Sequence, residues 1–541
     1  MAGAVDPDRH RLTRLPTWVV PALGALPIAG LAVFYAWPFA TLLGRVLRPS
    51  SIGDTLHSPG IGRAIWFTCW QALVSTVLTM AVGFAPAYVL ARYRFRGRRA
   101  ALAIVTVPFM LPTVVVGAAF LALLPDGWHG TAAAVVLAHV FFNVAVMVRL
   151  VGAMWAVLPT DLTAVARTLG ASPGQVLRHV VLPLLRPALY AAASVVFIFT
   201  FTSFGVVKLL GGAKHSTIEV EIARRATQLG DIDGAAVLSV VQLIVLAVVV
   251  WWSARWQRRA QHTFTAGHST RRPRSRSERR GVALVMAITV AAMVAPIAVM
   301  TARSFRTSSG WSLTPWRTLG ANEVRPGISL GVDPLGSLAV SLRYAALATV
   351  ISVVFGGLAA LTIASARRHG RLLDAGLLLP LGTSAVTIGL GMLITFDTGP
   401  FDWRAAWWLP PVGHALVAIP FVVRSLLPTL SSIGADQRLA AVTLGASPLR
   451  AWWEVEVRRL PAPLLSAAGF AAAISLGEFG ATTFLTRSGR DSMPIAIDRL
   501  LGRTGAVPHA QAFALATVLF VLTAAVVAVA DRQEADDARR A

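Results

Sequence analysis

The chain has very little cysteine and lysine. Cys69 is the single cysteine among 541 residues, which excludes a disulfide within the chain and any metal centre built from several cysteines. Lys208 and Lys214 are the only lysines, so the formal net charge of +24 rests almost entirely on arginine. Charged residues make up 14% of the chain, against about 25% in ordinary soluble proteins. A composition so poor in charge argues against a set of soluble domains.

Motifs for nucleotide, metal and acyl-transfer chemistry are also missing. The sequence has no Gly-x-x-x-x-Gly-Lys-Ser/Thr loop, no His-Glu-x-x-His pair and no nucleophile elbow. We therefore expect no cofactor, no bound metal and no catalytic residue, so the chain is not expected to be an enzyme. Energy for any transport must come from another chain or from an ion gradient.

Long apolar runs dominate the sequence instead. Hydrophobic residues make up 55% of the chain, and its mean hydropathy is +0.66. Runs of about 20 apolar residues can cross a bilayer as helices. They predict an all-α polytopic membrane protein of about twelve spans, near residues 17–43, 64–91, 101–124, 131–157, 187–210, 234–254, 281–302, 337–365, 372–396, 408–430, 463–485 and 509–530. The first run is too long for a signal peptide and is expected to be retained.

Arginine clusters predict the orientation in the cell (inner or plasma) membrane. They occur at 9–14, 92–99, 158–187, 255–280, 367–371, 431–462 and after 531. With the spans above, all of them fall on one side of the membrane, which the positive-inside rule identifies as cytoplasmic. Both termini are then cytoplasmic. Charge divided into short clusters between apolar runs does not indicate nucleic-acid binding. The basic stretch at 271–280 is expected to be disordered and to lie near anionic lipid headgroups.

A six-residue sequence occurs twice. The letters Thr-Leu-Gly-Ala-Ser-Pro begin at Thr168 and again at Thr443, 275 positions later. In each copy the glycine can close a helix, the serine can cap the next helix, and proline fits its first position. The same spacing relates His139 to His414 and Arg149 to Arg424. The pattern predicts an internal duplication whose helix–turn–helix segments project from the membrane.

The duplication predicts five regions. They are a cytoplasmic tail at 1–16, a first transmembrane repeat at 17–254, a basic cytoplasmic linker at 255–280, a second transmembrane repeat at 281–530 and a cytoplasmic tail at 531–541. Each repeat is expected to hold six spans, with the repeated segment between the fourth and fifth. Because an even number of spans precedes the second copy, the repeats are parallel, related by a two-fold axis along the membrane normal.

The repeated segment resembles the "EAA" loop of the permease subunits of ATP-binding-cassette importers. Two copies in one chain are similar to the fused permeases of the iron(III) and thiamine import systems. The resemblance implies that both loops dock on a separate ATPase, whose dimer would share the two-fold symmetry. The implied coupling residues are Asp161, Gly170, Ala171, Ser172 and Pro173 in the first copy, and Asp436, Gly445, Ala446, Ser447 and Pro448 in the second.

The match to this loop pattern has departures. The glutamate that lies six positions before the family's glycine is replaced by Ala164 and Leu439. Asp161 and Asp436, nine positions before each glycine, are candidates to take over part of its polar contacts. The resemblance therefore does not define which residues of the loop contact the ATPase.

The resemblance also implies a translocation path along the fifth and eleventh spans. Its candidate lining residues are Ser203, Phe204 and Lys208 in the fifth, with Glu478 and Phe479 in the eleventh. Lys208 and Glu478 could line an outer vestibule as a pair, because charges at this depth usually face a cavity or a partner. Alternatively, Lys208 reaches the interface and Glu478 caps a break in its helix. The half-polar segments 216–222 and 491–497 that follow could meet an extracytoplasmic substrate-binding protein, or could pack locally.

Two other classes of protein compete with this interpretation. A secondary active transporter of the major-facilitator type also has six plus six spans, and residues 94–99 resemble part of its basic loop. It leaves the repeated loop unexplained. A membrane-embedded enzyme lacks a catalytic constellation. We therefore expect an importer permease that passes a small solute, of the iron(III) or thiamine type, from an extracytoplasmic binding protein across the bilayer.

Overall fold

The computed structural model describes residues 18–47, 49–259, 270–320, 323–325, 328–329, 331–365, 369–397, 402–487 and 489–540. The predicted tail at 1–16 and linker residues 260–269 lie outside these ranges. The described chain is mainly helical, which confirms the all-α prediction. Within it, nine helices have the length and apolar composition to cross a membrane, or eleven if two bent pairs are each counted as one span. The predicted number of about twelve spans is not confirmed.

The helices form two compact units, each assembled from separate parts of the sequence. We call Arg48–Leu330 with Ile497–Phe520 the first-half unit. The second-half unit combines Met1–Leu47, Gly331–Ala496 and Val521–Ala541. Two helices, α26 (Met493–Leu501) and α27 (Ala506–Arg540), contribute residues to both units.

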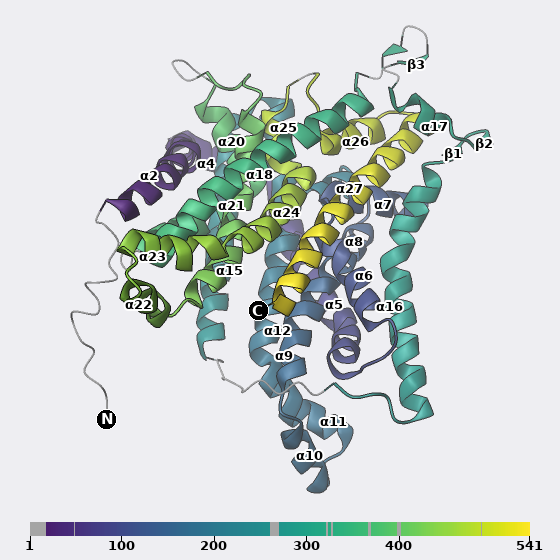
Figure 1. The fold of residues 1–541 in the computed structure, drawn as a ribbon. Coiled ribbons are helices and arrows are strands. Elements are labelled where there is room, and N and C mark those ends of the chain that lie inside the picture. Colours follow the sequence, from purple (N-terminus) through teal and green to yellow (C-terminus); the bar gives the residue numbers. More distant parts are fainter. Residues whose placement is uncertain are drawn as a thin grey trace. The chain divides into compact units, whose positions relative to one another are not determined.

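The first-half unit is built around α5, α8 and α12, which pack against one another (Figure 1). Its apolar core includes Val116, Val144 and Met147, all nearly inaccessible to solvent. Its elements are α4 (Pro49–Leu56), α5 (Ile61–Arg92), α6 (Arg98–Met110), α7 (Thr113–Leu123), η2 (Asp126–Trp128), α8 (Ala132–Val146), η3 (Met147–Val151), α9 (Gly152–Val157), α10 (Thr160–Thr168), α11 (Pro173–Val176), η4 (Leu177–Val181), α12 (Leu182–Phe201), α13 (Gly205–Leu210), α14 (Ile218–Arg224), η5 (Arg225–Leu229), α15 (Ile232–Arg259), α16 (Arg276–Arg303), α17 (Thr314–Arg317) and η6 (Thr318–Gly320). Two antiparallel hairpins follow α16, pairing β1 (Arg306–Thr307) with β2 (Gly310–Trp311) and β3 (Glu323–Arg325) with β4 (Ile328–Ser329).

The second-half unit is built around α18, α21 and α24. Its core includes Ala348, Ala418 and Val422 from these helices or their neighbours. Its elements are α2 (Val19–Leu31), η1 (Ala32–Ala36), α3 (Trp37–Val46), α18 (Pro334–Ser365), α19 (His369–Gly382), α20 (Ala385–Thr395), α21 (Leu409–Ser431), α22 (Ala435–Thr443), α23 (Pro448–Val455), η7 (Val457–Arg459), α24 (Pro461–Gly477) and α25 (Gly480–Leu485).

The two units exchange their opening spans. The N-terminal span Val19–Val46 belongs to the second-half unit, where α2 packs on α18 and α3 packs on α20. Conversely, α16 opens the second half of the sequence but packs on α6 and α7 in the first-half unit. The compact units therefore do not coincide with the predicted repeats at 17–254 and 281–530. The repeats are defined by the duplicated sequence, and the units are defined by packing.

Four predicted spans are not continuous helices. The span at 101–124 is α6 and α7, bent by 106° at Leu111 and Pro112. Leu111 precedes proline and is extended, with ψ 144°, because the proline ring disfavours helical geometry at the residue before it. The spans at 187–210, 372–396 and 463–485 also break, between α12 and α13, α19 and α20, and α24 and α25. The break at Glu478 was one of the alternatives that the sequence left open, whereas hydropathy alone shows none of the four because broken segments stay apolar.

The basic stretch at 271–280 is not disordered. Arg271 pairs with Tyr93 in a short parallel bridge, and its backbone is bonded to Arg92 and Arg94. Its guanidinium donates to Tyr93 Oη at 3.2 Å and to Glu278 Oε1 at 2.6 Å. Arg276 then begins α16. The prediction of disorder for this stretch was wrong because specific bonds to the turn after α5 offset the entropy of ordering it.

Candidate functional site

The first copy of the repeated segment is a tight helix–turn–helix. Gly170 ends α10 with φ +85°, a conformation that glycine adopts without steric cost. The N–H of Gly170 donates to Arg167 O at 3.0 Å, and that of Ala171 donates to Ala166 O at 3.0 Å. This pair of bonds is the Schellman motif that closes a helix C-terminus. Ser172 then begins α11 with a capping box, accepting from the backbone N–H of Gln175.

The second copy repeats this geometry 275 residues later. Gly445 ends α22 with φ +87°, and the same two bonds form from Gly445 to Val442 O (2.9 Å) and from Ala446 to Ala441 O (3.1 Å). Ser447 caps α23 by accepting from the N–H of Arg450 at 3.3 Å. The sequence prediction of a helix closed by glycine and followed by a serine cap is therefore confirmed in both copies.

Both turns are exposed to solvent. Asp161, Gly170, Ser172 and Pro173 are exposed in the first copy and Ala171 is half-buried. Asp436, Gly445 and Ser447 are exposed in the second copy, where Ala446 and Pro448 are half-buried. The leucine before each glycine is also exposed, at 82% for Leu169 and 88% for Leu444. In Figure 1, α10 and α11 extend beyond the ends of α9 and α12 in the first-half unit. Each turn thus offers an apolar side chain on a short rigid element.

The two copies differ in how they join the following span. In the first copy, α11, η4 and α12 run as one helix, Pro173–Phe201. In the second copy the helices Pro448–Arg459 and Pro461–Gly477 meet at an angle of 48°, because Pro461 cannot donate the backbone bond that would continue the helix. An ion pair found only in the second copy joins α22 to the end of α23. Arg438 Nε lies 2.6 Å from Oε1 of Glu456, whose side chain is fully buried, whereas Thr163 and Val181 occupy the corresponding places in the first copy.

The candidate path residues of the fifth span lie at the break between α12 and α13. Ser203 and Phe204 are buried, and Ser203 Oγ lies 2.8 Å from His139 Nε2 in α8. Lys208 lies one helical turn beyond Phe204, with Nζ 5.5 Å from the centre of that ring. Its ammonium donates to Asp498 Oδ2 at 2.7 Å within the first-half unit. The ion pair of Lys208 that the structure describes is thus with Asp498, which the sequence prediction did not name.

The candidate path residues of the eleventh span lie at the matching break between α24 and α25. Glu478 and Phe479 are buried, and the Glu478 carboxylate accepts the N–H of Ala481 at 2.8 Å. Glu478 therefore caps α25, which was the alternative to lining a vestibule. His414 is hydrogen-bonded to Ser475 and Thr482, both at 2.8 Å. His139 and His414 thus both form hydrogen bonds with residues of other elements.

The half-polar segments after these breaks form α14 and the start of α26. Each helix begins with the same type of contact. The N–H of Ile218 donates to Thr68 Oγ1 at 2.9 Å, and the N–H of Met493 donates to Ser341 Oγ at 2.8 Å. Because Ile218 and Met493 correspond in the repeat, the contact is a structural sign of the duplication. Within the described ranges, no cluster of three or more His, Cys, Asp or Glu could hold a metal ion.

Comparison with known proteins identifies the chain's relatives. Residues 79–262 match the family described as "Binding-protein-dependent transport system inner membrane component". The thiamine transport system permease protein of Salmonella typhimurium is 25% identical over 95% of this chain and 97% of its own length. The corresponding protein of Brucella abortus is 28% identical over 95% of both chains. The molybdenum transport system permease protein of Mycobacterium bovis is 34% identical over 44% of this chain and 94% of its own length.

These matches cover both halves of the sequence and agree with the many apolar helices of a multi-pass inner-membrane protein. They displace the secondary transporter and the membrane-embedded enzyme as alternatives. The chain belongs to the binding-protein-dependent transport permeases, as a fused two-repeat permease of an ATP-binding-cassette importer of the thiamine and iron(III) type, which is not itself an enzyme and relies on a separate ATPase subunit.

Proposed function

We propose that the chain carries a small solute across the membrane by alternating access, and that a separate ATPase drives it through the two exposed turns. The observation that carries this proposal is the repetition of one turn geometry at Gly170 and Gly445, 275 residues apart, with an exposed leucine beside each. Exposed apolar residues on a rigid element suit a protein partner. Two equivalent turns suit a partner dimer.

Each turn is connected to the proposed path by a spanning helix. The first turn leads through the helix Pro173–Phe201 to the break at Ser203. The second leads through Pro448–Arg459, across the 48° bend before Pro461, and through α24 to the break at Glu478. A rigid helix moves as one body, so a displacement of the turn reaches the break. Ser203, Phe204, Lys208, Glu478 and Phe479 remain our candidates for the path on this argument.

The proposed orientation places both turns, the linker at 255–280 and both chain termini in the cytoplasm. Its support is the clustering of arginine on one side of the predicted spans. On the opposite side, α14 and α26 would then face an extracytoplasmic binding protein. The repeats at 17–254 and 281–530 would provide one half of the path each.

The names of the relatives suggest candidate solutes. Thiamine is the first because relatives named as thiamine permeases match over nearly the whole chain. Molybdenum oxyanions follow from a relative that matches over a shorter part. Iron(III) follows from the resemblance of the repeated loops to the fused iron permeases.

The proposal is tested by measuring solute uptake into membrane vesicles of controlled orientation that contain the chain, its binding protein and its ATPase. Labelled thiamine, ferric iron and molybdate are supplied with and without ATP. The Leu169→Glu/Leu444→Glu variant should insert normally, because both side chains are exposed, but should lose ATPase binding and ATP-driven uptake. Leu313→Glu, an exposed leucine directly before α17 and outside both turns, is the matched control. Full uptake in the double variant would refute the role of the turns.

A further inference from the structure

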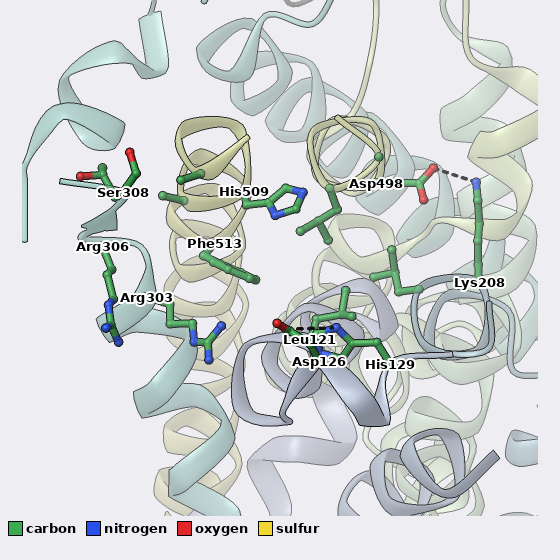
Figure 2. A pocket seen from close by; sticks show the side chains of 16 residues that line it. Leu121, Asp126, His129, Lys208, Arg303, Arg306, Ser308, Asp498, His509 and Phe513 are labelled. Carbon is green, nitrogen blue, oxygen red and sulfur yellow. Dashed lines mark hydrogen bonds and ion pairs between the residues drawn. The ribbon is translucent and has the colours of Figure 1, made fainter. Parts of the chain in front are cut away.

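A cavity of about 760 Å³ lies in the first-half unit beyond the C-terminal end of α16 (Figure 2). Its volume lies within the range of ordinary small-ligand sites, about 300 to 1,000 Å³. Its walls carry three cationic side chains, Lys208, Arg303 and Arg306, against two carboxylates, Asp126 and Asp498. Two imidazoles, those of His129 and His509, also line it. The balance of charge in the cavity is therefore positive.

Each carboxylate of the cavity lies near a basic side chain. Asp498 Oδ2 lies 2.7 Å from Lys208 Nζ, and both side chains are largely shielded, with 20% and 27% of their surface exposed. Asp126 Oδ1 lies 3.8 Å from His129 Nδ1 on the same short loop. Asp498 is therefore committed to Lys208, whereas the Asp126 side chain is almost fully exposed, at 99%.

The two arginines lie on another wall of the cavity. Arg303 ends α16 and Arg306 begins β1, and Figure 2 shows both across the cavity from Lys208, with His509 and Phe513 between them. In the part of the chain that the structure describes, no carboxylate lies within ion-pair distance of either guanidinium. Two exposed guanidiniums without a carboxylate partner among the described residues leave this wall of the cavity positively charged.

We propose that this cavity binds a small oxyanion, a phosphate-, molybdate- or carboxylate-type group, through Arg303 and Arg306. The planar guanidinium presents paired N–H donors that match two oxygens of such a group, which a metal cation or an organic cation cannot use. The positive balance of charge in the cavity also disfavours binding of a free cationic solute. Under the proposed orientation the cavity opens on the extracytoplasmic side, but oxyanion binding itself does not depend on transport.

The test measures binding to the purified full-length chain in nanodiscs of zwitterionic lipid, without ATPase or binding protein. Labelled inorganic phosphate and molybdate are titrated at low salt, with choline and thiamine as cationic competitors. We expect saturable binding that the cations do not displace and that weakens as salt screens the exposed arginines. Arg303→Gln/Arg306→Gln should lower the affinity at least about tenfold, the effect of losing a charge-assisted hydrogen bond. Arg317→Gln, an exposed arginine on α17 outside the cavity, should leave it unchanged.

A further variant separates anion binding from a purely structural role. Asp498→Asn removes one negative charge from the cavity wall and should raise the oxyanion affinity several-fold, a gain that structural damage cannot produce. A parallel set of nanodiscs with phosphatidylglycerol distinguishes a lipid headgroup from a soluble anion. Retention of that lipid through the same two arginines, without binding of soluble phosphate or molybdate, would assign the oxyanion to a lipid. Absence of both kinds of binding, or an unchanged affinity in the arginine variant, would overturn the proposal. Loss of ATP-driven uptake alone would not overturn the proposal of an oxyanion site.

Discussion

Nε2 of His139 lies 2.8 Å from Oγ of Ser203, two residues after α12 has ended. Both side chains are buried, so the bond holds a non-helical stretch of backbone against α8 in a place where water is scarce. His414 has the corresponding position in the second half and binds Ser475 and Thr482. Each histidine therefore fixes the break in the span that follows a repeated turn.

Removing the Ser203 hydroxyl should destabilise this break. In Ser203→Ala the Nε2 atom of the buried His139 loses its hydrogen-bond partner, while Nδ1 keeps its longer contact with Ser75 (3.5 Å), and the expected cost is about 1–3 kcal/mol. Thermal unfolding in detergent measures the loss. Thr202→Val is the matched control, because the Thr202 hydroxyl binds Ile198 O of its own helix at 2.9 Å and holds no second helix. Equal losses in the two variants would mean that the contact between α8 and the break is not what matters.

The two exposed turns should tolerate asparagine but not valine. A Cβ at Gly170 or Gly445 would meet no atom within 4 Å, so a substitution acts only through the positive φ. Valine in that conformation is strained by roughly 1–3 kcal/mol, whereas asparagine adopts it readily. We expect Gly170→Val/Gly445→Val to open the turns to limited proteolysis and to reduce ATP-driven uptake. The asparagine pair should behave as the wild type, and similar behaviour of both pairs would exclude turn geometry as the cause.

The ion pair between Arg438 and Glu456 should stabilise the second turn only. Arg438→Met leaves a buried carboxylate without its cation, and we expect a loss of roughly 3 kcal/mol, the lower end for such pairs because Arg438 is partly exposed. The double variant Arg438→Met/Glu456→Leu should regain most of the stability. Proteolysis of α22 and α23, compared with α10 and α11, measures the effect. A double variant as unstable as the single one would show that the charges are not coupled.

Ionisation of Tyr93 should lower the stability of the fold around the turn after α5. Burial raises the pKa of the Tyr93 phenol to about 12, with a contribution from its hydrogen bond to Tyr88. The neutral phenol is thus the form that the folded state favours. Its contribution to stability is complete below about pH 10, the value of an ordinary tyrosine, and is lost as the pH rises through 12.

Spectroscopic titration tests the direction of the shift in the Tyr93 pKa. The difference between the wild type and Tyr93→Phe should show one phenol that ionises near pH 12, and the melting temperature of the wild type should fall over the same range. A difference curve with its midpoint near pH 10 would contradict the burial of Tyr93.

The sequence alone was enough to determine the class of protein, the duplication and the geometry of the repeated turns. These properties depend on local chemistry. Apolar runs must lie in lipid, a glycine at the end of a helix closes it, and a serine caps the next one wherever the chain places them. The predictions at Gly170, Ser172, Gly445 and Ser447 were therefore confirmed.

Only the tertiary structure decided which spans pack together and which partners the charged residues have. Hydropathy does not show that the span Val19–Val46 joins the second-half unit, because every apolar helix suits lipid equally well and side-chain packing selects its neighbour. It also does not pair Lys208 with Asp498, 290 positions away, or place Arg271 on Tyr93. Such contacts depend on distances through space between residues far apart in the chain, and the packing of the helices is what brings them together.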